Sequence, residues 1–202
     1  MATTERPHAT YQDVLDAPEH KVAEIVNGEL HLSPRPGGPA SSVNTALGGE
    51  LYQPFGRGRG GPGGWLFVFE PELHFGDDIV VPDFAAWRRE RLPVVPEGAF
   101  FTLAPDWICE VLSRSTEKFD RAEKLAVYAR AGVRFAWLVH PRRRTLEAFR
   151  LHDGKWLTIA VHKDDDRVRV EPFDAIELDL AVLWADTPLP TRAGEEAAEY
   201  AY

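Results

Sequence analysis

Cysteine is almost absent from this chain of 202 residues, since Cys109 is its only one. A single cysteine cannot form an internal disulfide, and Cys and His do not recur at the spacing of a structural zinc site. Residues 1–10 lack the order of a secretory signal, and no apolar run is long enough to span a bilayer. We therefore expect a cytoplasmic protein with no membrane segment.

Basic residues are also scarce, because 23 Lys and Arg stand against 32 Asp and Glu, a formal net charge of −9. Proteins that coat nucleic acid usually spread positive charge over a whole face, so any contact with nucleic acid should be local. By contrast, 44% of the residues are hydrophobic and six are Trp, enough for a sizeable core. We expect one domain over residues 1–186 and a disordered polar tail over 187–202.

The N-terminal part indicates a hairpin and then a helix. Residues 22–32 are two apolar-rich runs around Asn27-Gly28, the strongest short signal for a β-hairpin. An apolar repeat at helical spacing then predicts a helix that Ser41 caps and Pro54 ends.

The rest of the chain indicates strands around one long helix. After a Gly-rich loop over 55–64, the expected strands of an antiparallel meander are 65–69, 73–75 and 79–87. A strand over 107–112, a helix over 116–131 that Gly132 terminates, and a strand over 133–139 follow in order. A hairpin over 145–151 and 156–161 and a short element over 176–184 come last.

Strand, helix and strand in succession imply a right-handed crossover and a buried parallel pair. Together with the N-terminal hairpin and the antiparallel meander, this pair predicts a mixed central sheet flanked by helices. The expected fold class is therefore α/β, of the mixed α+β kind.

Two carboxylates interrupt otherwise apolar strands, namely Asp83 in the run 79–87 and Glu110 in the run 107–112. A carboxylate is costly to bury unless it is paired, protonated or bound to a cation. One such residue alone more often lies at a strand end and faces water. Two of them, with a lysine in reach, favour a functional site.

Lys124 is that lysine, and it follows Asp120 by four residues on the expected helix. The simpler interpretation is a surface ion pair, worth at most about 1 kcal/mol. The alternative uses the crossover, which places the helix just beyond the strand of Glu110, so that the long side chain reaches this carboxylate.

Magnesium prefers oxygen ligands and is usually held by one or two protein carboxylates, several waters and substrate phosphate. Asp83 and Glu110 would suffice for such a site. A bound divalent ion activates water and stabilises charge on phosphoryl oxygens, and an ammonium neutralises the developing anion. The residues therefore point to metal-assisted hydrolysis of a phosphodiester.

Several short motifs follow one another along the chain: Glu24-Ile-Val-Asn-Gly-Glu-Leu, Pro82-Asp83, Glu110-Val-Leu-Ser113-Arg-Ser-Thr, Asp120-Arg121 followed by Lys124, Tyr128, Gly132-Val133, Trp137-Leu-Val and Pro141. Through these motifs the chain resembles the Uma-two family of restriction endonucleases, over about residues 11–186. Each piece alone is weak, but their combination in this order is specific.

The resemblance implies a PD-(D/E)XK nuclease core in which Asp83, Glu110 and the carbonyl of Val111 hold Mg²⁺ or Mn²⁺. It also implies that Glu24 is an accessory acid. The superfamily pattern has a Lys two residues after the metal-binding Glu, where this chain has Leu112. Lys124 from the following helix is expected to take over that role.

Other candidates have weaker support. Scattered histidines without ligand spacing read as surface or turn residues: His31, His74, His140 and His152. Ser113 and Ser115 lack the surroundings of a nucleophilic serine, and Ser115 or Thr116 more plausibly caps the following helix. Arginines that could touch phosphates are Arg57, Arg59, Arg88, Arg89, Arg91 and the turn Arg142-Arg143-Arg144, although such a run is usually solvated.

These observations predict a metal-dependent endonuclease with Asp83, Glu110, Lys124 and Glu24 as catalytic residues, acting on nucleic acid, with DNA expected. The alternatives are a catalytically silent nuclease-fold module that binds nucleic acid or a protein, and an unrelated binding protein whose acidic residues face solvent. A homodimer is expected by analogy, because two symmetric sites suit the cutting of two strands.

Overall fold

The computed structural model describes residues 8–187. In chain order its elements are α1 (Tyr11–Leu15), β1 (Lys21–Val26), β2 (Glu29–Pro34), α2 (Gly38–Leu51), the π-helical turn η1 (Tyr52–Gly56), β3 (Trp65–Phe69), β4 (Leu73–Phe75), β5 (Asp78–Val80), β6 (Phe84–Arg88), β7 (Trp107–Val111), α3 (Glu117–Phe119), the π-helical turn η2 (Asp120–Lys124), α4 (Leu125–Ala131), β8 (Phe135–His140), β9 (Thr145–His152), β10 (Lys155–Lys163), β11 (Arg167–Val168), β12 (Leu178–Asp179) and α5 (Ala181–Trp184). Of the predicted tail, Thr187 is described and buried, and 188–202 lie outside the described residues.

The largest sheet has six strands in the order β10-β9-β8-β7-β6-β3. Strands β7 and β8 are parallel, and the other pairs are antiparallel. The chain between β7 and β8 forms the expected helix, which ends at Gly132 in the left-handed conformation with a φ of 79°. The predicted mixed sheet, its parallel crossover and the β9–β10 hairpin are confirmed.

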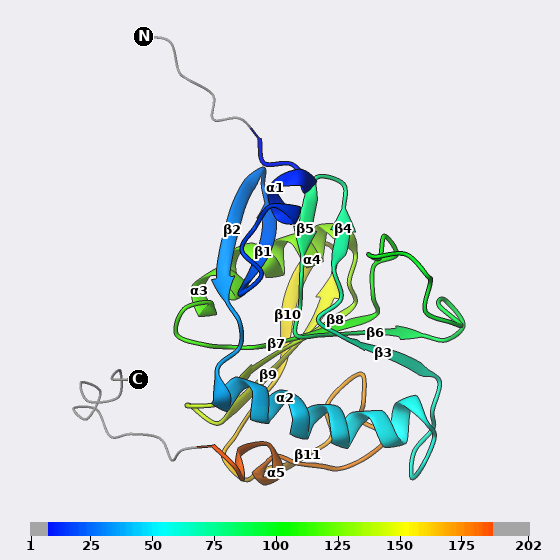
Figure 1. Cartoon of the computed structure of the whole chain (residues 1–202). Coiled ribbons are helices and arrows are strands. Elements are labelled where there is room, and N and C mark those ends of the chain that lie inside the picture. The colour runs from blue at the N-terminus through cyan, green and yellow to red at the C-terminus, as the bar shows by residue number, and fades with distance from the viewer. Residues whose placement is uncertain (1–7, 188–202) are drawn as a thin grey trace, which may run out of the picture.

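A smaller four-stranded sheet has the order β2-β1-β5-β4 and lies beside the large one (Figure 1). Its β1–β2 hairpin turns at Asn27 and Gly28, both with positive φ, while Val26 pairs with Glu29. Positive φ at both central residues is what a tight hairpin turn of this hand requires. The hairpin prediction is confirmed.

The prediction of one strand over 79–87 is wrong. Strand β5 ends at Val80 in the small sheet, and β6 begins at Phe84 in the large one. Between them lies Val81-Pro82-Asp83, a link that crosses from one sheet to the other. Pro82 has no N–H to donate to a strand partner, which suits a break in the ladder.

The helix predicted to end at Pro54 instead continues beyond it. A π-helical turn, η1, follows α2, and the Arg57 N–H donates to the Tyr52 carbonyl at 3.0 Å. This wider turn carries Pro54 inside it, so the ring that was expected to stop the helix is accommodated. A second π-helical turn, η2, interrupts the helix predicted over 116–131.

Helices cover both faces of the large sheet (Figure 1). Helices α2 and α5 pack on one face around a cluster of aromatic rings, which includes Trp65, Trp107, Trp137, Trp184 and Phe173. Helix α4 packs on the opposite face against Ile108, Ala136 and Leu138 of β7 and β8. The strands between these layers, β7 and β8, are therefore buried on both sides, as a parallel pair usually is.

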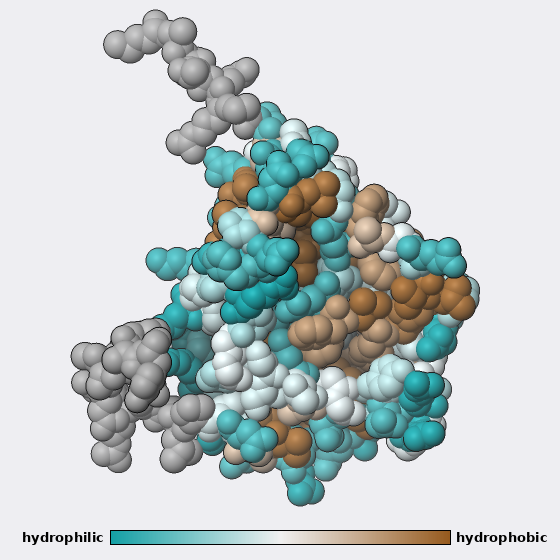
Figure 2. All heavy atoms as spheres, viewed as in Figure 1, coloured by the Kyte–Doolittle hydropathy of each residue, from teal (hydrophilic) through white to brown (hydrophobic). Residues whose placement is uncertain are grey.

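Exposed apolar side chains gather on the segment between β6 and β7, which carries Val94, Val95, Phe100 and Leu103. Figure 2 shows apolar side chains on the right of the molecule, the side where this segment lies in Figure 1. Among the helices of the described residues, none has the length and apolar character needed to cross a membrane.

Candidate active site

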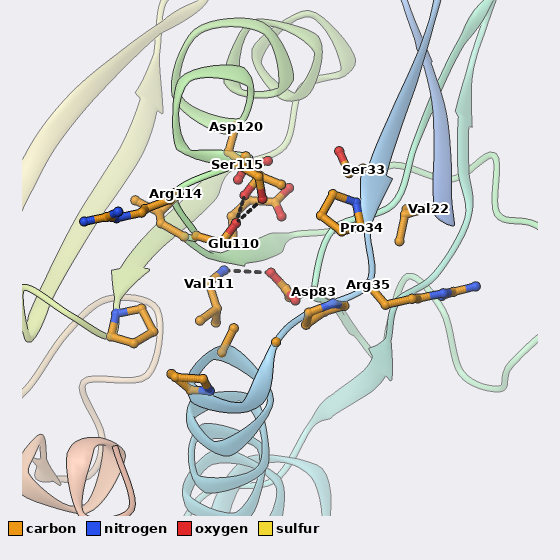
Figure 3. A pocket seen from close by; sticks show the side chains of 18 of the residues that line it. Val22, Ser33, Pro34, Arg35, Asp83, Glu110, Val111, Arg114, Ser115 and Asp120 are labelled. Atoms are coloured by element: carbon orange, nitrogen blue, oxygen red, sulfur yellow. Dashed lines mark hydrogen bonds between the residues drawn. The ribbon is translucent and has the colours of Figure 1, made fainter. Parts of the chain in front are cut away.

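A cleft of about 500 Å³ opens where β6 and β7 meet the β1–β2 hairpin and the N-terminus of α2. Five predicted residues line this cleft: Glu24, Asp83, Glu110, Val111 and Lys124. Figure 3 shows the Asp83 and Glu110 side chains near Val111, with Ser33 and Pro34 across the opening and the Arg35 side chain pointing away from the two acids. The sheet register explains this meeting, because Phe84 pairs with Cys109, so that the next residues along are Asp83 and Glu110.

The Asp83 carboxylate is held through both oxygens. The Val111 N–H donates to Oδ2 at 2.7 Å (Figure 3), and the Asn44 side-chain amide donates to Oδ1 at 2.8 Å. Val111 is the last residue of β7 and Asn44 lies on α2. Asp83 therefore sits at the break between the two sheets, fixed by one backbone and one side-chain donor.

Glu110 is buried, with 2% of its surface exposed, and its Oε1 accepts from two side chains. Tyr128 of α4 donates its hydroxyl at 2.6 Å, and the Lys124 ammonium lies at 2.9 Å. A buried carboxylate requires such partners, because an unpaired charge away from water is strongly unfavourable. Tyr128, which the sequence marks only as part of a motif, is therefore a direct hydrogen-bond partner of Glu110.

Lys124 is buried, with 3% of its surface exposed, so the interpretation of a surface ion pair with Asp120 is wrong. Its Nζ lies 2.8 Å from Glu24 Oε1, 2.9 Å from Glu110 Oε1 and 2.9 Å from the Val81 carbonyl. These acceptors match the three N–H donors of an ammonium. Asp120 is more distant, at 3.7 Å.

Glu24 and Lys124 together hold the link that carries Asp83. Glu24 Oε1 accepts the Val81 N–H at 2.8 Å, while Lys124 donates to the carbonyl of the same residue. Both backbone groups of Val81 are thus satisfied by one ion pair rather than by a strand. This pair sets the path of the chain two residues before Asp83.

The π-helical turn η2 places Asp120 and Lys124 on the buried side of the helix. A π-helical turn adds a residue to the ordinary repeat, and such bulges occur frequently at functional sites. Thr116 begins the helix without a side-chain capping bond. The Ser113 hydroxyl instead forms hydrogen bonds with the hydroxyls of Ser115 and Thr116, each at 3.0 Å.

Burial and mutual repulsion raise the pKa values of Glu110, Asp83 and Asp120. Burial raises the pKa of Glu110 well above its usual range against the attraction of Lys124, and nearby Asp120 and Asp83 raise it further. Burial also raises the pKa of Asp83, against hydrogen bonds from Val111 and Asn44. The pKa of Asp120 is raised to about 6, mainly by burial.

Burial opposes the charge on Lys124, but attraction by Glu110 and Glu24 outweighs it, and the pKa of the ammonium rises well above its ordinary value. Lys124 is therefore a permanent cation inside the cluster. Four carboxylates nevertheless face this single ammonium: those of Glu24, Asp83, Glu110 and Asp120. An excess of negative charge of this kind suits a further cation.

The donor set fits a divalent ion with few protein ligands. Within residues 8–187, no group of three or more His, Cys, Asp or Glu side chains is arranged as a metal cage. Asp83 and Glu110 provide two carboxylates, as many as Mg²⁺ usually takes from a protein. The Val111 N–H donates to Asp83, so the backbone of Val111 lies beside this carboxylate.

Most of the weaker candidates lie outside the cleft. Arg57 and Arg88 stack over Tyr52 and Trp65, while Arg143 pairs with Glu117. Four of them do line the cleft, namely Ser113, Ser115, His140 and Arg142. His140 is buried, so its interpretation as a surface or turn residue is wrong.

Asn44 and Arg35 were not singled out in the sequence. Asn44 lies in the apolar repeat of α2, where one polar residue on the buried side was the available signal. Arg35 lies in the loop before α2, lines the cleft and pairs with Glu70 at 3.3 Å. No pattern in the sequence distinguished it from other exposed arginines.

A mixed sheet flanked by helices, with acidic residues where two central strands meet, places the chain in the nuclease-fold class of α+β proteins. A solved structure has this architecture: the "crystal structure of a putative nuclease belonging to DUF820 from Anabaena variabilis ATCC 29413" is 24% identical, with a TM-score of 0.68. The match covers 88% of this chain and 98% of that one. This similarity shows the fold.

The chain belongs to the Uma2 (Uma-two) family, whose model matches residues 9–182 and whose description is "putative restriction endonuclease". The resemblance drawn from the motifs is confirmed. Its family places the chain among nucleases, which are hydrolases. No curated protein shows a significant similarity to the chain.

Proposed function

We propose that the protein is a metal-dependent endonuclease that hydrolyses phosphodiester bonds of DNA. The meeting of Asp83 and Glu110 in one cleft, beside a buried lysine, carries this proposal. It supplies two oxygen ligands, a fixed positive charge and space for a substrate strand. These are the parts that metal-assisted hydrolysis requires.

Asp83, Glu110 and the Val111 carbonyl would hold Mg²⁺ or Mn²⁺, and the bound ion would lower the pKa of water and stabilise charge on the phosphoryl oxygens. Lys124 favours the charged form of the buried Glu110 carboxylate against the effect of burial, through a contact of 2.9 Å. Glu24, the accessory acid, fixes Lys124 from the other side at 2.8 Å.

Lys124 also adds a positive field at the inner end of the cleft, where a phosphate would develop extra negative charge. Arg35 and Arg142 at the cleft would provide local positive charge for the flanking backbone. This arrangement is consistent with an acidic protein that contacts DNA over a small area. The homodimer stays a prediction, because both strands of a duplex need a site.

One observation favours a second candidate, a nuclease-fold module that binds nucleic acid or a protein without cutting. The three donors of Lys124 are matched by Glu24, Glu110 and the Val81 carbonyl. A phosphate would have to displace one of these acceptors to contact the ammonium. In the silent module no phosphate displaces an acceptor of Lys124, and the ammonium only neutralises the carboxylates around it.

Nicking of supercoiled plasmid with Mg²⁺ or Mn²⁺ separates the two candidates. The wild-type protein should cut, and Asp83→Asn should not, because the substitution removes one charged ligand of the ion. Its melting temperature should be unchanged or raised, since burial disfavours the Asp83 carboxylate.

Asp153→Asn is the matched control, because the Asp153 side chain is 90% exposed in the β9–β10 turn, and it should cut normally. Cleavage by Asp83→Asn at the wild-type rate would remove Asp83 from the mechanism. A wild-type protein that binds Mn²⁺ in calorimetry but leaves plasmid intact would favour the silent module.

A further inference from the structure

The two bonds to Asp83 come from different layers of the fold. Val111 contributes a backbone N–H from β7, within the sheet. Asn44 contributes a side-chain amide from α2, 39 residues away along the chain. A carboxylate with one donor can rotate about its Cβ–Cγ bond, whereas a donor on each oxygen holds its plane. Each oxygen keeps a lone pair for a further ligand.

Asn44 occupies a position where an apolar side chain would be expected. The other buried residues of α2 are Ala40, Val43, Leu47 and Leu51. Asn44 is itself only 3% exposed. Its Oδ1 is buried and has no hydrogen-bond partner among the described residues. A buried polar atom without a partner is unfavourable, so an amide retained here calls for a reason outside folding.

We infer that Asn44 is a positioning residue that orients the Asp83 carboxylate for binding the divalent ion. This inference rests on the proposed metal site. Residues behind the ligands of a metal commonly fix their orientation, and their loss typically lowers metal affinity or activity by about 10–100-fold. Asn44 has this relation to Asp83, through a bond of 2.8 Å. The unpartnered Oδ1 is the cost of turning Nδ2 toward the carboxylate.

The test is Asn44→Leu, which keeps a similar volume and removes the donor. Mn²⁺ affinity, measured by calorimetry on the full chain, should fall about 10-fold or more. The melting temperature without metal should change little, because the loss of the hydrogen bond to Asp83 is offset by the replacement of the unpartnered Oδ1 with an apolar group. A residue with a purely structural role would not lower Mn²⁺ affinity while leaving the melting temperature of the metal-free protein nearly unchanged.

Two variants of the same helix are matched controls. Thr45→Ala changes an exposed neighbour and should alter neither property. Leu47→Ala opens a cavity in the core, so it should lower the melting temperature and leave Mn²⁺ affinity unchanged. If Asn44→Leu does not fold, Asn44→Ala replaces it in the same comparison with Leu47→Ala.

The outcomes separate this inference from the proposed function. Wild-type Mn²⁺ affinity in Asn44→Leu, together with its loss in Asp83→Asn, would overturn the role of Asn44 and keep the metal site. A wild-type protein that binds no Mn²⁺ would overturn the metal site and the inference with it. A wild-type protein that binds Mn²⁺ but cuts no DNA, with weaker binding in Asn44→Leu, would overturn only the nuclease function.

Discussion

A lysine with 3% of its surface exposed lies among carboxylates at the inner end of the cleft, and its charge is needed there. Lys124→Met keeps the aliphatic stem but leaves Glu24 and Glu110 uncompensated. Breaking a buried ion pair in this way typically costs about 3–5 kcal/mol. We therefore expect a loss of this size in the free energy of unfolding at neutral pH, measured by urea denaturation.

Lys118→Met is the control for this variant, because Lys118 is exposed on the same helical segment and should contribute little. Cleavage should also fall in Lys124→Met, and it must be assayed at a temperature where the variant is folded. A Lys124→Met protein as stable as the wild type would show that the ammonium is not the counter-ion of the cluster.

Asp120 makes the stability of the protein depend on pH. Its pKa is raised from 3.8 to about 6, mainly by burial, so the native state binds a proton that the unfolded chain releases between these values. A raised carboxyl pKa means that the charged form destabilises the native state above pH 6, and stability from this residue increases as the pH falls through about 6.

Asp120→Asn should therefore raise the free energy of unfolding at pH 7.5, by on the order of 1–3 kcal/mol, with a smaller gain at pH 5. Thermal melts at the two pH values measure this difference. Asp153→Asn, on an exposed turn, should leave the pH dependence unchanged. An Asp120→Asn variant that is less stable than the wild type at pH 7.5 would mean that attraction by Lys124 outweighs burial.

At the scale of elements, two glycines on helices should respond oppositely to alanine. Gly132 ends α4 with a φ of 79°, where an L-residue is disfavoured, and Gly49 lies within α2. A Cβ would meet no atom within 4 Å at either position, so backbone conformation alone decides the sign. Gly132→Ala should cost about 1–2 kcal/mol, and Gly49→Ala should add about 0.5–1 kcal/mol.

Thermal unfolding of Gly132→Ala and Gly49→Ala under the same conditions measures the two stability changes. Each variant is the control for the other. Cleavage should be unchanged in both, since neither residue lines the cleft. Equal melting temperatures would contradict the left-handed end of α4.

The π-helical turn η2 is a second feature at the scale of elements. Turn η2 adds a residue to the helix between β7 and β8, and both Asp120 and Lys124 are buried there. Apolar periodicity predicts a continuous helix over this region, because the pattern on either side of a single turn is nearly the same. The turn can be recognised only in the tertiary structure, where Lys124 contacts carboxylates on β1 and β7.

For the whole molecule, an ion that binds only the native state should stabilise it by an amount that grows with the logarithm of its concentration above the dissociation constant. At about 100 times the dissociation constant, this linkage amounts to about 2.7 kcal/mol. For a protein of this size, that corresponds to a rise of roughly 5–10 °C in melting temperature. Mn²⁺ should give such a rise in the wild-type protein and little or none in Asp83→Asn.

The comparison with Asp83→Asn distinguishes Mn²⁺ bound in the cleft from Mn²⁺ bound elsewhere on a chain whose formal net charge is −9. A rise of equal size in Asp83→Asn would place the ion on the acidic surface rather than in the cleft. Asp153→Asn should respond like the wild-type protein, because its carboxylate lies far along the chain on an exposed turn.

The sequence by itself determined what depends on local pattern. Asn27-Gly28 predicted the hairpin, Gly132 the end of α4, and the order of strand, helix and strand the parallel pair, because turn chemistry and periodicity are local properties. Asp83 and Glu110 stood out for a similar reason, since a carboxylate inside an apolar run is unusual wherever the run goes.

Only the tertiary structure decided which distant groups meet. The burial of Lys124, its contacts with Glu24 and Glu110, and the bond from Asn44 to Asp83 depend on sheet register and on the placement of two helices on opposite faces. The change of sheet at Val81-Pro82-Asp83 is of the same kind. From the sequence, an apolar run is predicted as one strand even where its two halves pair in different sheets. Strand pairing involves residues that are remote in the chain, so local pattern does not reveal the break.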